Sequence, residues 1–394
     1  MKNIEIVNRK PIIKEDTVIC KTCIYDANVP AINFNNEGVC NYCEMISNLK
    51  ELYGTGTSKG LESFFGILDK IKKEGRGKKY DCVVGVSGGT DSSYIIAKAV
   101  EWGLRPLAVH YDNTWNTAIA TENIRKVLGK LNVDLYTHVT DNKESDDIFK
   151  SFFLANVPEI DGPTDIALAQ TLYKAASKFN VKYVLEGHSF MTEGVSPLST
   201  AYVDGAYIKN VHKMFGKIKM KTFPNMDFYS FMKWVLVKRI KKIRPLWYIP
   251  YSKEEAREFL EKEFGWEYYG GHHLENRMTA FNHSVYFPRK FGVDQRNNSL
   301  SALVRADVMT HKEAINEYNS EPVVEEDLIP YFKKRLGISD QMFADVMNAE
   351  RKSYKDYPTY KKRFERLRPI FYILAKFNLV PMSFYIKYTS KSEV

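Results

Sequence analysis

The stretch that decides the fold is DCVVGVSGGTDSSYIIAKAVEW, from Asp81 to Trp102. It begins with an apolar, β-rich run over 81–86, turns through Gly88 and Gly89, and continues as a helix. One face of that helix carries Ile95, Ile96, Ala99 and Val100. A strand that passes through a glycine turn into an amphipathic helix is the opening unit of a parallel αβ sheet.

The same rhythm continues along the chain. Further short β-rich runs occupy 106–111, 133–139 and 181–187, and helical windows at 121–131 and 165–178 lie between them. Strands that alternate with helices at this spacing predict an α/β fold with a parallel, doubly wound sheet that is covered by helices on both faces. Beyond residue 247 the pattern becomes mostly helical, and capping pairs Ser252/Glu255 and Thr310/Glu313 open two of the expected helices.

The glycine turn is a candidate phosphate site. Two glycines let the backbone approach a ligand closely, and the first turn of the following helix presents free N–H groups to an anion. Neither the Walker pattern nor the dinucleotide pattern G-x-G-x-x-G is present. The loop residues of this candidate site are Ser87, Gly88, Gly89, Thr90, Asp91, Ser92 and Ser93, and the four hydroxyl side chains among them can donate to phosphate.

This S-G-G-x-D-S turn resembles the pyrophosphate loop of the N-type ATP pyrophosphatases, the PP-loop superfamily. The resemblance implies a fold of the adenine nucleotide alpha hydrolase-like type, in which the loop holds ATP while it is split into AMP and pyrophosphate. It also implies that Asp91 holds Mg²⁺ or its bound water. The ends of two later strands would face the nucleotide, through Asp112 in VHYDN and through Gly187 and His188 in LEGHS.

Four of the five cysteines form two C-x2-C pairs: Cys20, Cys23, Cys40 and Cys43. Two such pairs bring four thiolates within reach of one ion, and we expect a structural Zn²⁺ with no open coordination position. An iron–sulfur cluster is the alternative. Cys82 falls inside the first predicted strand, where we expect a packed core residue rather than a nucleophile.

Composition limits the class of protein. The 394 residues are 44% hydrophobic and 27% charged, which is ordinary for a globular protein, and no window offers about 20 uninterrupted apolar residues. Few cysteines and no recognisable signal peptide predict a cytoplasmic protein. Much of the net charge of +9 falls in a basic segment at 208–244, which suggests a phosphate-bearing ligand, an acidic partner or an anionic membrane surface.

The predicted domains are a zinc ribbon at 1–55, a PP-loop domain at 56–250 and a mostly helical substrate or partner region at 251–394. The Gly/Ser/Thr-rich stretch at 52–60 reads as a linker.

Two stretches narrow the function: YYGGHHLENRMTAF at 268–281 and FPRKFGVDQRNNSLSALVRADVMTHKEAI at 287–315. Together with the cysteine pairs and the loop, in this order, they resemble the N-acetyl sugar amidotransferases of the WbpG/PseA type. That resemblance implies ATP-dependent conversion of the acetamido group of a nucleotide-linked sugar into an acetamidino group, through an adenylated intermediate. The pathway would be the biosynthesis of surface polysaccharide (the lipopolysaccharide O-antigen) or of nonulosonic acid. The catalytic candidates are Asp91, Lys290 and His272, with Arg289, Arg296 and His273 as further candidates for charge neutralisation or substrate contact.

The same resemblance implies that ammonia comes from a HisH-like glutaminase through a HisF-like channel subunit, the two halves of an imidazole glycerol phosphate synthase. The sequence agrees, because it lacks the G-x-C-x-G nucleophile pattern and has Lys2 where an N-terminal cysteine would stand. A tRNA-thiolating PP-loop enzyme is the alternative, since it would explain the loop, the cysteine pairs and the basic charge. A third reading is a nucleotide-binding scaffold without catalytic activity.

Overall fold

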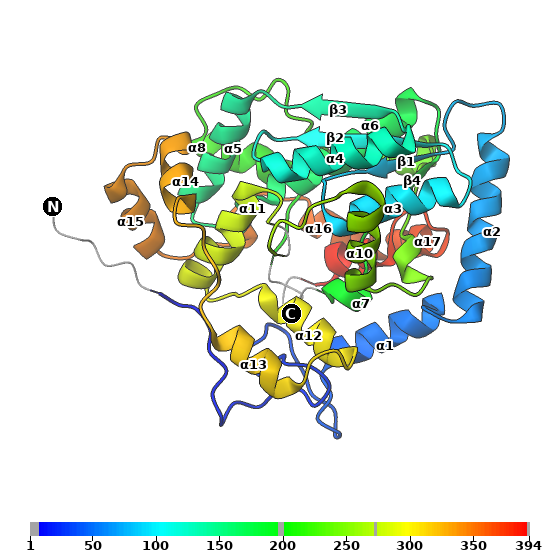
Figure 1. Ribbon diagram of the computed structural model, residues 1–394. Coiled ribbons are helices and arrows are strands. Elements are labelled where there is room, and N and C mark those ends of the chain that lie inside the picture. Colours follow the sequence, from blue (N-terminus) through cyan, green and yellow to red (C-terminus); the bar gives the residue numbers. More distant parts are fainter. Residues whose placement is uncertain (1–7, 196–200, 272–273, 392–394) are drawn as a thin grey trace.

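A computed structural model describes residues 8–195, 201–271 and 274–391. Its centre is a sheet of five parallel strands in the order β3-β2-β1-β4-β5. The strands are β1 (Cys82–Gly85), β2 (Pro106–Asp112), β3 (Leu135–Val139), β4 (Tyr183–Leu185) and β5 (Lys241–Ile243). In register, Val84 of β1 lies opposite Ala108 of β2 and Leu185 of β4. The predicted parallel, doubly wound sheet is therefore confirmed (Figure 1).

Helices cover both faces of this sheet, and β1 shows the division residue by residue. Cys82 and Val84 point into a core shared with α3 (Thr90–Glu101), α4 (Ala118–Leu131) and α10 (Lys253–Phe264). Val83 points to the opposite face, where α6 (Gly162–Lys178) packs. This alternation is the period-two geometry of a strand that is buried on both sides.

The order of the strands locates the functional edge of the sheet. The chain runs outward from β1 through β2 to β3, and then returns through α5 (Asn142–Leu154) and α6 to place β4 on the other side of β1. In an open α/β sheet, ligands bind beyond the carboxyl ends of the strands at this reversal. The crevice between β1 and β4 is where the loop at 87–93 lies.

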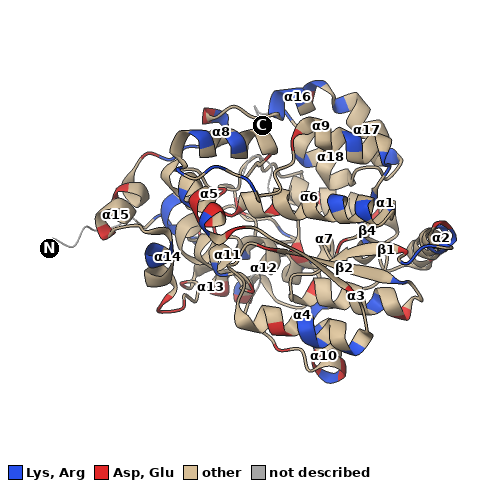
Figure 2. Ribbon diagram, turned by 90° about the horizontal axis from the view of Figure 1, so that it is seen from above, with Lys and Arg blue, Asp and Glu red and all other residues tan. Residues whose placement is uncertain are grey.

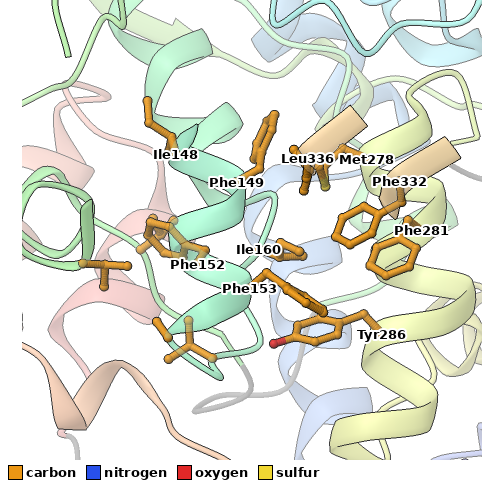
Figure 3. Packing of buried hydrophobic residues seen from close by; sticks show 14 of the residues in the cluster. Ile148, Phe149, Phe152, Phe153, Ile160, Met278, Phe281, Tyr286, Phe332 and Leu336 are labelled. Atoms are coloured by element: carbon orange, nitrogen blue, oxygen red, sulfur yellow. The ribbon is translucent and has the colours of Figure 1, made fainter. Parts of the chain in front are cut away.

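The C-terminal part is mostly helical, and an aromatic core joins it to α5. Figure 3 shows Phe149 and Phe153 of α5 facing Phe281, Tyr286 and Phe332. The rings of Phe281 and Phe332 are stacked with centroids 3.6 Å apart. Phe281 ends α11 (Arg277–Phe281), Tyr286 lies in the π-helix η3 (Asn282–Phe291), and Phe332 lies in α14 (Leu328–Leu336). The remaining helices of this part are α12 (Arg296–Arg305), α13 (His311–Asn319), α15 (Asp340–Asn348), η4 (Tyr354–Asp356), α16 (Lys361–Arg366), α17 (Arg368–Lys376) and α18 (Met382–Thr389).

Shorter elements connect the sheet to its surroundings: α7 (Phe190–Glu193), α8 (Gly205–Phe215), α9 (Phe228–Met232), the π-helix η1 (Lys233–Val237) and the 3₁₀-helix η2 (Pro245–Trp247). Within the described ranges no helix has the length and apolar character to cross a bilayer.

The cysteine-rich segment lies beside α12 and α13 (Figure 1). Two isolated antiparallel bridges hold it, and α1 (Asn41–Tyr53) begins directly after Cys40. The stretch expected to be a linker is instead a tight turn between α1 and α2 (Ser58–Gly75). Thr55 donates its hydroxyl to the carbonyl of Trp247, and the amide of Gly56 donates to that of Tyr248. The linker prediction was wrong because these distant carbonyls bind the turn.

Candidate functional site

The loop after β1 depends on two glycines. Gly88 has φ +84°, and a Cβ built on it would lie 2.1 Å from the carbonyl oxygen of Ala120 at the start of α4. Gly187, which follows β4, lies so close to the loop that a Cβ there would be 2.8 Å from the backbone of Asp91. Glycine at both positions therefore lets the ends of β1 and β4 approach each other.

The N-terminus of α3 faces the cavity. Its N-cap is Gly89, which has no side chain to accept the first N–H groups of the helix. Ser92 bends back into the loop, where its hydroxyl donates to the carbonyl of Gly89 and accepts from the amide of Ser87, 3.2 Å away. The positive end of a helix whose N-cap residue offers no side-chain acceptor is a binding site for an anion.

Asp91 is the charged group of this helix end. One carboxylate oxygen accepts a hydrogen bond from the Tyr251 hydroxyl, and the other pairs with the Lys253 ammonium at 3.1 Å. Burial alone would raise the pKa of Asp91, but the charge of Lys253 and the Tyr251 hydrogen bond outweigh it and hold the pKa below its usual value. The pKa of Lys253 is raised in turn, because the carboxylates of Asp91 and Glu193 outweigh its own burial. The group is an ionised pair at neutral pH.

Lys253 and Tyr251 were not found by sequence reasoning. They lie 160 or more residues beyond Asp91, and no motif marks them. The sheet brings them together, since β5 leads through η2 into the loop 248–252 beside the start of α3. In the sequence, the stretch SKEE at 252–255 indicates only the start of a helix.

The end of β4 supplies the predicted His188. Its Nδ1 accepts a hydrogen bond from the indole N–H of Trp247 at 3.1 Å, and its Nε2 lies 3.6 Å from Glu193. The preceding Glu186 pairs with Lys242 at 2.6 Å and with Arg244. Burial would raise the pKa of Glu186, but these two cations lower it to about 2.

At the end of β2 the structure places Asn113, not the predicted Asp112, on the cavity wall. The Asp112 carboxylate accepts from the amide of Thr114, whose φ is +65°. His110, on β2 itself, is a buried histidine satisfied on both nitrogens, by the carbonyl of Val86 and by the amide of Asn116. Asp112 therefore supports the turn and lies outside the cavity lining.

A network of amide side chains joins this edge to the C-terminal part. Asn276 donates to the oxygens of both Asn113 and Asn116, at 3.0 and 2.9 Å. Asn282, which is buried, donates to Asp161 at 2.8 Å, and its own oxygen has no partner among the described residues. Buried polar atoms in proteins are normally satisfied, so an unpaired amide oxygen on a cavity wall indicates a place for a ligand donor. Glu275 lies at the loop, with one carboxylate oxygen 3.5 Å from the Ser87 hydroxyl.

These groups line one cavity of about 1110 Å³. Sites for single small molecules are usually about 300–1,000 Å³, so this cavity has room for a nucleotide and a second substrate. Of the residues predicted to bind phosphate or nucleotide, the lining includes Ser87, Gly89, Thr90, Asp91, Ser92, Gly187 and His188. Gly88 and Ser93 stand behind it in the loop.

Lys290 is not part of this lining. It is fully buried in η3, where its ammonium donates to Asn156 Oδ1 at 2.9 Å and to the carbonyls of Val346 and Ala349. Burial lowers its pKa to about 8. Lys290 therefore holds the end of α15. It lies away from the loop at 87–93 and outside the cavity lining.

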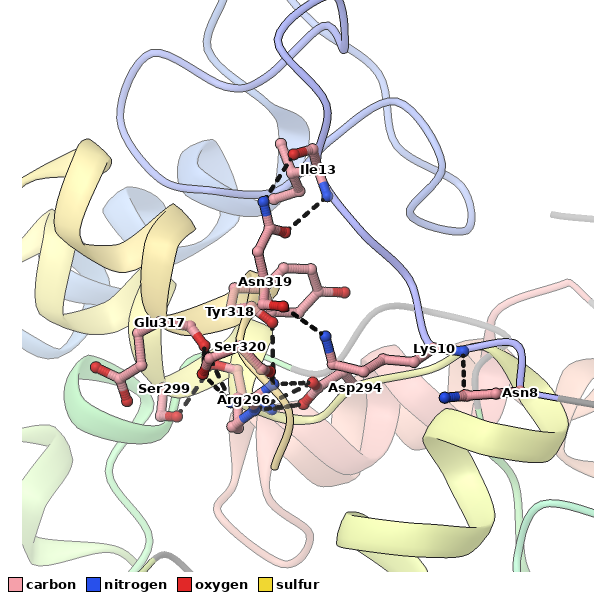
Figure 4. Close-up of polar contacts among 10 residues, drawn as sticks. All are labelled: Asn8, Lys10, Ile13, Asp294, Arg296, Ser299, Glu317, Tyr318, Asn319 and Ser320. Atoms are coloured by element: carbon pink, nitrogen blue, oxygen red, sulfur yellow. Dashed lines mark hydrogen bonds and ion pairs between the residues drawn. The ribbon is translucent and has the colours of Figure 1, made fainter. Parts of the chain in front are cut away.

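Arg296 also has structural partners (Figure 4). Its guanidinium pairs with Asp294 at 2.6 Å and donates to the carbonyls that end α13. Arg289 does not line the cavity, and its carbonyl accepts from the amide of Arg9. His272 and His273 lie outside the described residues.

The four paired cysteines converge. The sulfur of Cys20 lies 3.9 Å from that of Cys43, the sulfur of Cys23 lies 3.8 Å from that of Cys40, and all four lie within 4.8 Å of one another. A tetrahedron with Zn–S bonds of about 2.3 Å has sulfurs about 3.8 Å apart, so the set fits a single zinc ion. A cubane cluster would hold its thiolates further apart, because its iron and sulfide atoms lie between them. Backbone N–H groups of Thr22, Tyr25 and Cys43 point at the sulfurs, as around a metal-bound thiolate.

The comparison with known families concerns residues 275–368, from Glu275 in the cavity through η3 to α17. This range matches the family model of the LPS biosynthesis protein WbpG-like, C-terminal domain. Over these residues the chain is similar to that domain. It has no match among curated protein sequences.

Solved structures share the general arrangement only distantly. NMN synthetase from Francisella tularensis is 15% identical with a TM-score of 0.31, and the alignment covers 71% of this chain and 93% of that one. The U34-tRNA thiolase NcsA from Methanococcus maripaludis with its [4Fe-4S] cluster is 13% identical, with a TM-score of 0.34 and coverage of 85% and 94%. The NH3-dependent NAD synthetase from Campylobacter jejuni is 13% identical, with a TM-score of 0.28 and coverage of 73% and 96%. Because these TM-scores are all below 0.5, the three structures support no conclusion about the function of this chain.

Proposed function

We propose that the protein is an ATP-dependent amidotransferase that converts the acetamido group of a nucleotide-linked N-acetyl sugar into an acetamidino group. One observation carries this proposal: the WbpG-like domain and the glycine loop contribute to the same cavity. Glu275, Asn276 and Asn282 of that domain lie on its wall together with Asp91 and the N-terminus of α3. A phosphate site next to a wall that carries asparagine side chains suits a reaction between ATP and the amide group of a substrate.

The chemistry explains why ATP is needed. An amide carbonyl is a poor electrophile, and its oxygen is a poor leaving group. In the proposed reaction the acetamido oxygen attacks the α-phosphorus of ATP and pyrophosphate leaves. Ammonia then adds to the activated carbon, AMP departs with the former amide oxygen, and a proton is lost to give the acetamidine. Most of the protein's contribution is positioning and electrostatic stabilisation.

The residues of the cavity divide this work. The loop and the uncapped N–H groups of α3 would bind the pyrophosphate part of ATP, and the Lys253 ammonium supplies positive charge beside it. The carboxylates of Asp91 and Glu193 suit Mg²⁺, which prefers oxygen ligands and neutralises phosphate charge when bound. The Asn282 oxygen would accept the N–H of the acetamido group, with Asp161 holding the Asn282 side chain in place.

The ammonia would come from another polypeptide, a HisH-like glutaminase that delivers it through a HisF-like channel subunit. Hydrolysis of glutamine requires an activated thiolate. Four of the five cysteines converge on one metal-sized site, and Cys82 is fully buried in β1, where burial raises the pKa of its thiol. The biosynthesis of a lipopolysaccharide O-antigen or of a nonulosonic acid is the proposed setting.

The test uses the purified chain with ATP, Mg²⁺ and ammonium chloride, and a panel of UDP- and CMP-linked N-acetyl sugars. We expect pyrophosphate release that depends on one sugar, and a product in which mass spectrometry shows NH in place of oxygen. Glutamine should replace ammonium only when the two partner subunits are added. Copurifying tRNA that becomes thiolated would instead favour the thiolase, and ATP binding without pyrophosphate release from any sugar or tRNA would favour a scaffold.

A further inference from the structure

Two segments place apolar side chains in solvent on the side that faces away from the cavity and from the core that the segments share. The first is 229–241, which contains η1, and the second is 360–377, which contains α16 and α17. Tyr229 and Val237 in the first are 75% and 73% exposed, and Phe377 in the second is 68% exposed. The other exposed apolar residues of these segments are Leu236, Ile370, Tyr372 and Ile373. We call the two segments together the η1–α17 surface.

The two segments pack against each other through their opposite faces. The ring of Phe231 lies 6.3 Å from the rings of both Phe364 and Phe371. Trp234 of η1 and Leu374 of α17 are buried in the same core. The exposed side chains lie on the other faces of these helices, away from that core, so the apolar exposure is a property of the folded surface.

Ile370, Ile373 and Phe377 show that the exposure is ordered along α17. They are spaced by three and four residues, so they form one ridge on the outer face of the helix. Leu236 and Val237 form the corresponding exposed pair of η1, next to the buried Trp234 and Val235. Scattered surface hydrophobes need no explanation, but exposed apolar residues gathered on two segments that share one core indicate an interaction site.

Charge surrounds these ridges with one sign. Segments 229–241 and 360–377 hold ten lysines and arginines and a single acid, Glu365, which pairs with Lys361. Figure 2 shows α9, α16 and α17 together at one edge of the molecule, with blue on α16 and α17. The basic residues that the structure leaves exposed are Lys233, Lys238, Arg239, Lys362, Arg363, Arg366, Arg368 and Lys376.

We propose that the η1–α17 surface binds the interface of an anionic lipid bilayer. Apolar side chains that stand above a basic surface are the pattern by which proteins lie on membranes: the apolar groups enter the acyl boundary and the cations contact lipid headgroups. The sign of the charge favours a bilayer, because all eight exposed charged residues of the two segments are basic and anionic headgroups attract such clusters. The inference does not depend on the proposed amidotransferase activity.

The test is flotation or sedimentation of the full chain with vesicles of phosphatidylcholine alone or with one quarter phosphatidylglycerol. We expect binding to the anionic vesicles only, and loss of that binding at about 1 M salt, where the Debye length shrinks to about 3 Å. Replacing Lys376 with Gln should weaken binding about fivefold, the effect of one cation at an anionic surface. The double variant I373S/F377S should weaken it at least tenfold.

Matched substitutions elsewhere serve as controls. Val323 is 88% exposed and Lys143 is also exposed, and both lie outside the η1–α17 surface. Val323→Ser and Lys143→Gln should leave vesicle binding unchanged, and thermal melts of all variants would show that they fold. Absence of binding to anionic vesicles at low salt would overturn the proposal, as would equal losses in the control variants. A dimer of the wild type in light scattering that I373S/F377S abolishes, without vesicle binding, would assign the surface to a second copy of the chain instead.

Discussion

Asp91 holds a negative charge in a buried place because Lys253 and Tyr251 face it. Replacing Asp91 with Asn removes the negative charge of the proposed Mg²⁺ ligand while keeping the size of the side chain. We expect pyrophosphate release to fall at least 100-fold, about 3 kcal/mol of transition-state stabilisation. The measurement is a coupled pyrophosphate assay at saturating ATP and sugar.

Asp112 supplies the control for that variant, because it is also a carboxylate at the end of a strand. It accepts a hydrogen bond from the amide of Thr114 and lies outside the cavity lining. The activity of Asp112→Asn should stay within about threefold of wild type once a melt shows that it is folded. Equal losses in the two variants would remove the special role given to Asp91.

Glu159 is a residue whose burial has a consequence for stability. Its carboxyl is buried at the wall of the cavity and accepts from the amide of Tyr202 and the hydroxyl of Tyr207. Burial raises its pKa from 4.5 to about 7. Between these two pH values the folded state binds more protons than the unfolded state, so the free energy of unfolding should fall as pH rises, by up to about 3 kcal/mol.

Urea unfolding at a series of pH values tests this prediction. Glu159→Gln should remove the fall between pH 4.5 and about 7, whereas replacement of the exposed Glu37 with Gln should keep it. A wild-type stability that rises across this range, or an unchanged profile in Glu159→Gln, would contradict the assigned cause.

At the scale of elements, the turn between β1 and α3 depends on Gly88. A Cβ at this position would collide with the Ala120 carbonyl, and the positive φ disfavours any other residue. We therefore expect Gly88→Ala to lower the free energy of unfolding by about 2 kcal/mol and to weaken ATP binding, because the loop must move. Chemical denaturation and calorimetry of ATP binding measure the two effects.

Gly66 is the matched position, since it lies inside α2 and a Cβ there meets nothing within 4 Å. Gly66→Ala should raise the free energy of unfolding by about 0.5–1 kcal/mol, because alanine favours the helix. A Gly88→Ala protein as stable as wild type would show that the loop conformation is not imposed by this contact.

The elements that sequence patterns predicted well are those with a strong local signal. The runs at 81–86, 133–139 and 181–187 contain β1, β3 and β4, and the run at 106–111 covers all of β2 except its last residue. The pair Thr310/Glu313 forms a full capping box. The strand β5 was missed, because its sequence KKI offers one buried residue and two lysines. Ser252 accepts from the amide of Glu255, as the predicted helix start requires.

The site, like the elements, could be predicted from the sequence only where its residues form a local pattern. A glycine loop is a local pattern, and the residues that form it are neighbours in the sequence. Lys253, Tyr251 and Asn282 reach the cavity only through the fold, so no local spacing announces them. Lys290 was proposed from its charge, but the packing of η3 against α15 buries it. Charge in a sequence does not tell whether a lysine faces a cavity or caps a helix.

At the scale of the whole molecule, the cysteine site ties distant parts together. The hydroxyl of Tyr25, between the two cysteine pairs, donates to Asn298 Oδ1 of α12 at 2.5 Å, and its oxygen lies 3.2 Å from the carbonyl oxygen of Val195 next to α7. Arg305 of α12 lies 3.8 Å from the sulfur of Cys43. A metal held by these cysteines would therefore stabilise the part of the cavity wall around α7.

We predict one zinc per chain, which metal analysis can count. Zinc held by four thiolates contributes roughly 10 kcal/mol of local folding free energy, so Cys40→Ser should unfold the segment 15–43 and spare the sheet. Hydrogen exchange should then rise in that segment while β1 and β2 stay protected. Cys82→Ala, which removes the cysteine outside the cluster, should keep its zinc. Iron and sulfide in the purified protein would contradict the assignment.

The central claim is that the acetamido oxygen is adenylated in the cavity shared by the glycine loop and the WbpG-like domain. The most direct measurement labels that oxygen with its heavy isotope and follows it by mass spectrometry during turnover with ammonium. The account predicts that the label leaves in the phosphate of AMP, and that the sugar product carries nitrogen in its place. Label that stays in the sugar, or that appears in inorganic phosphate, would contradict it.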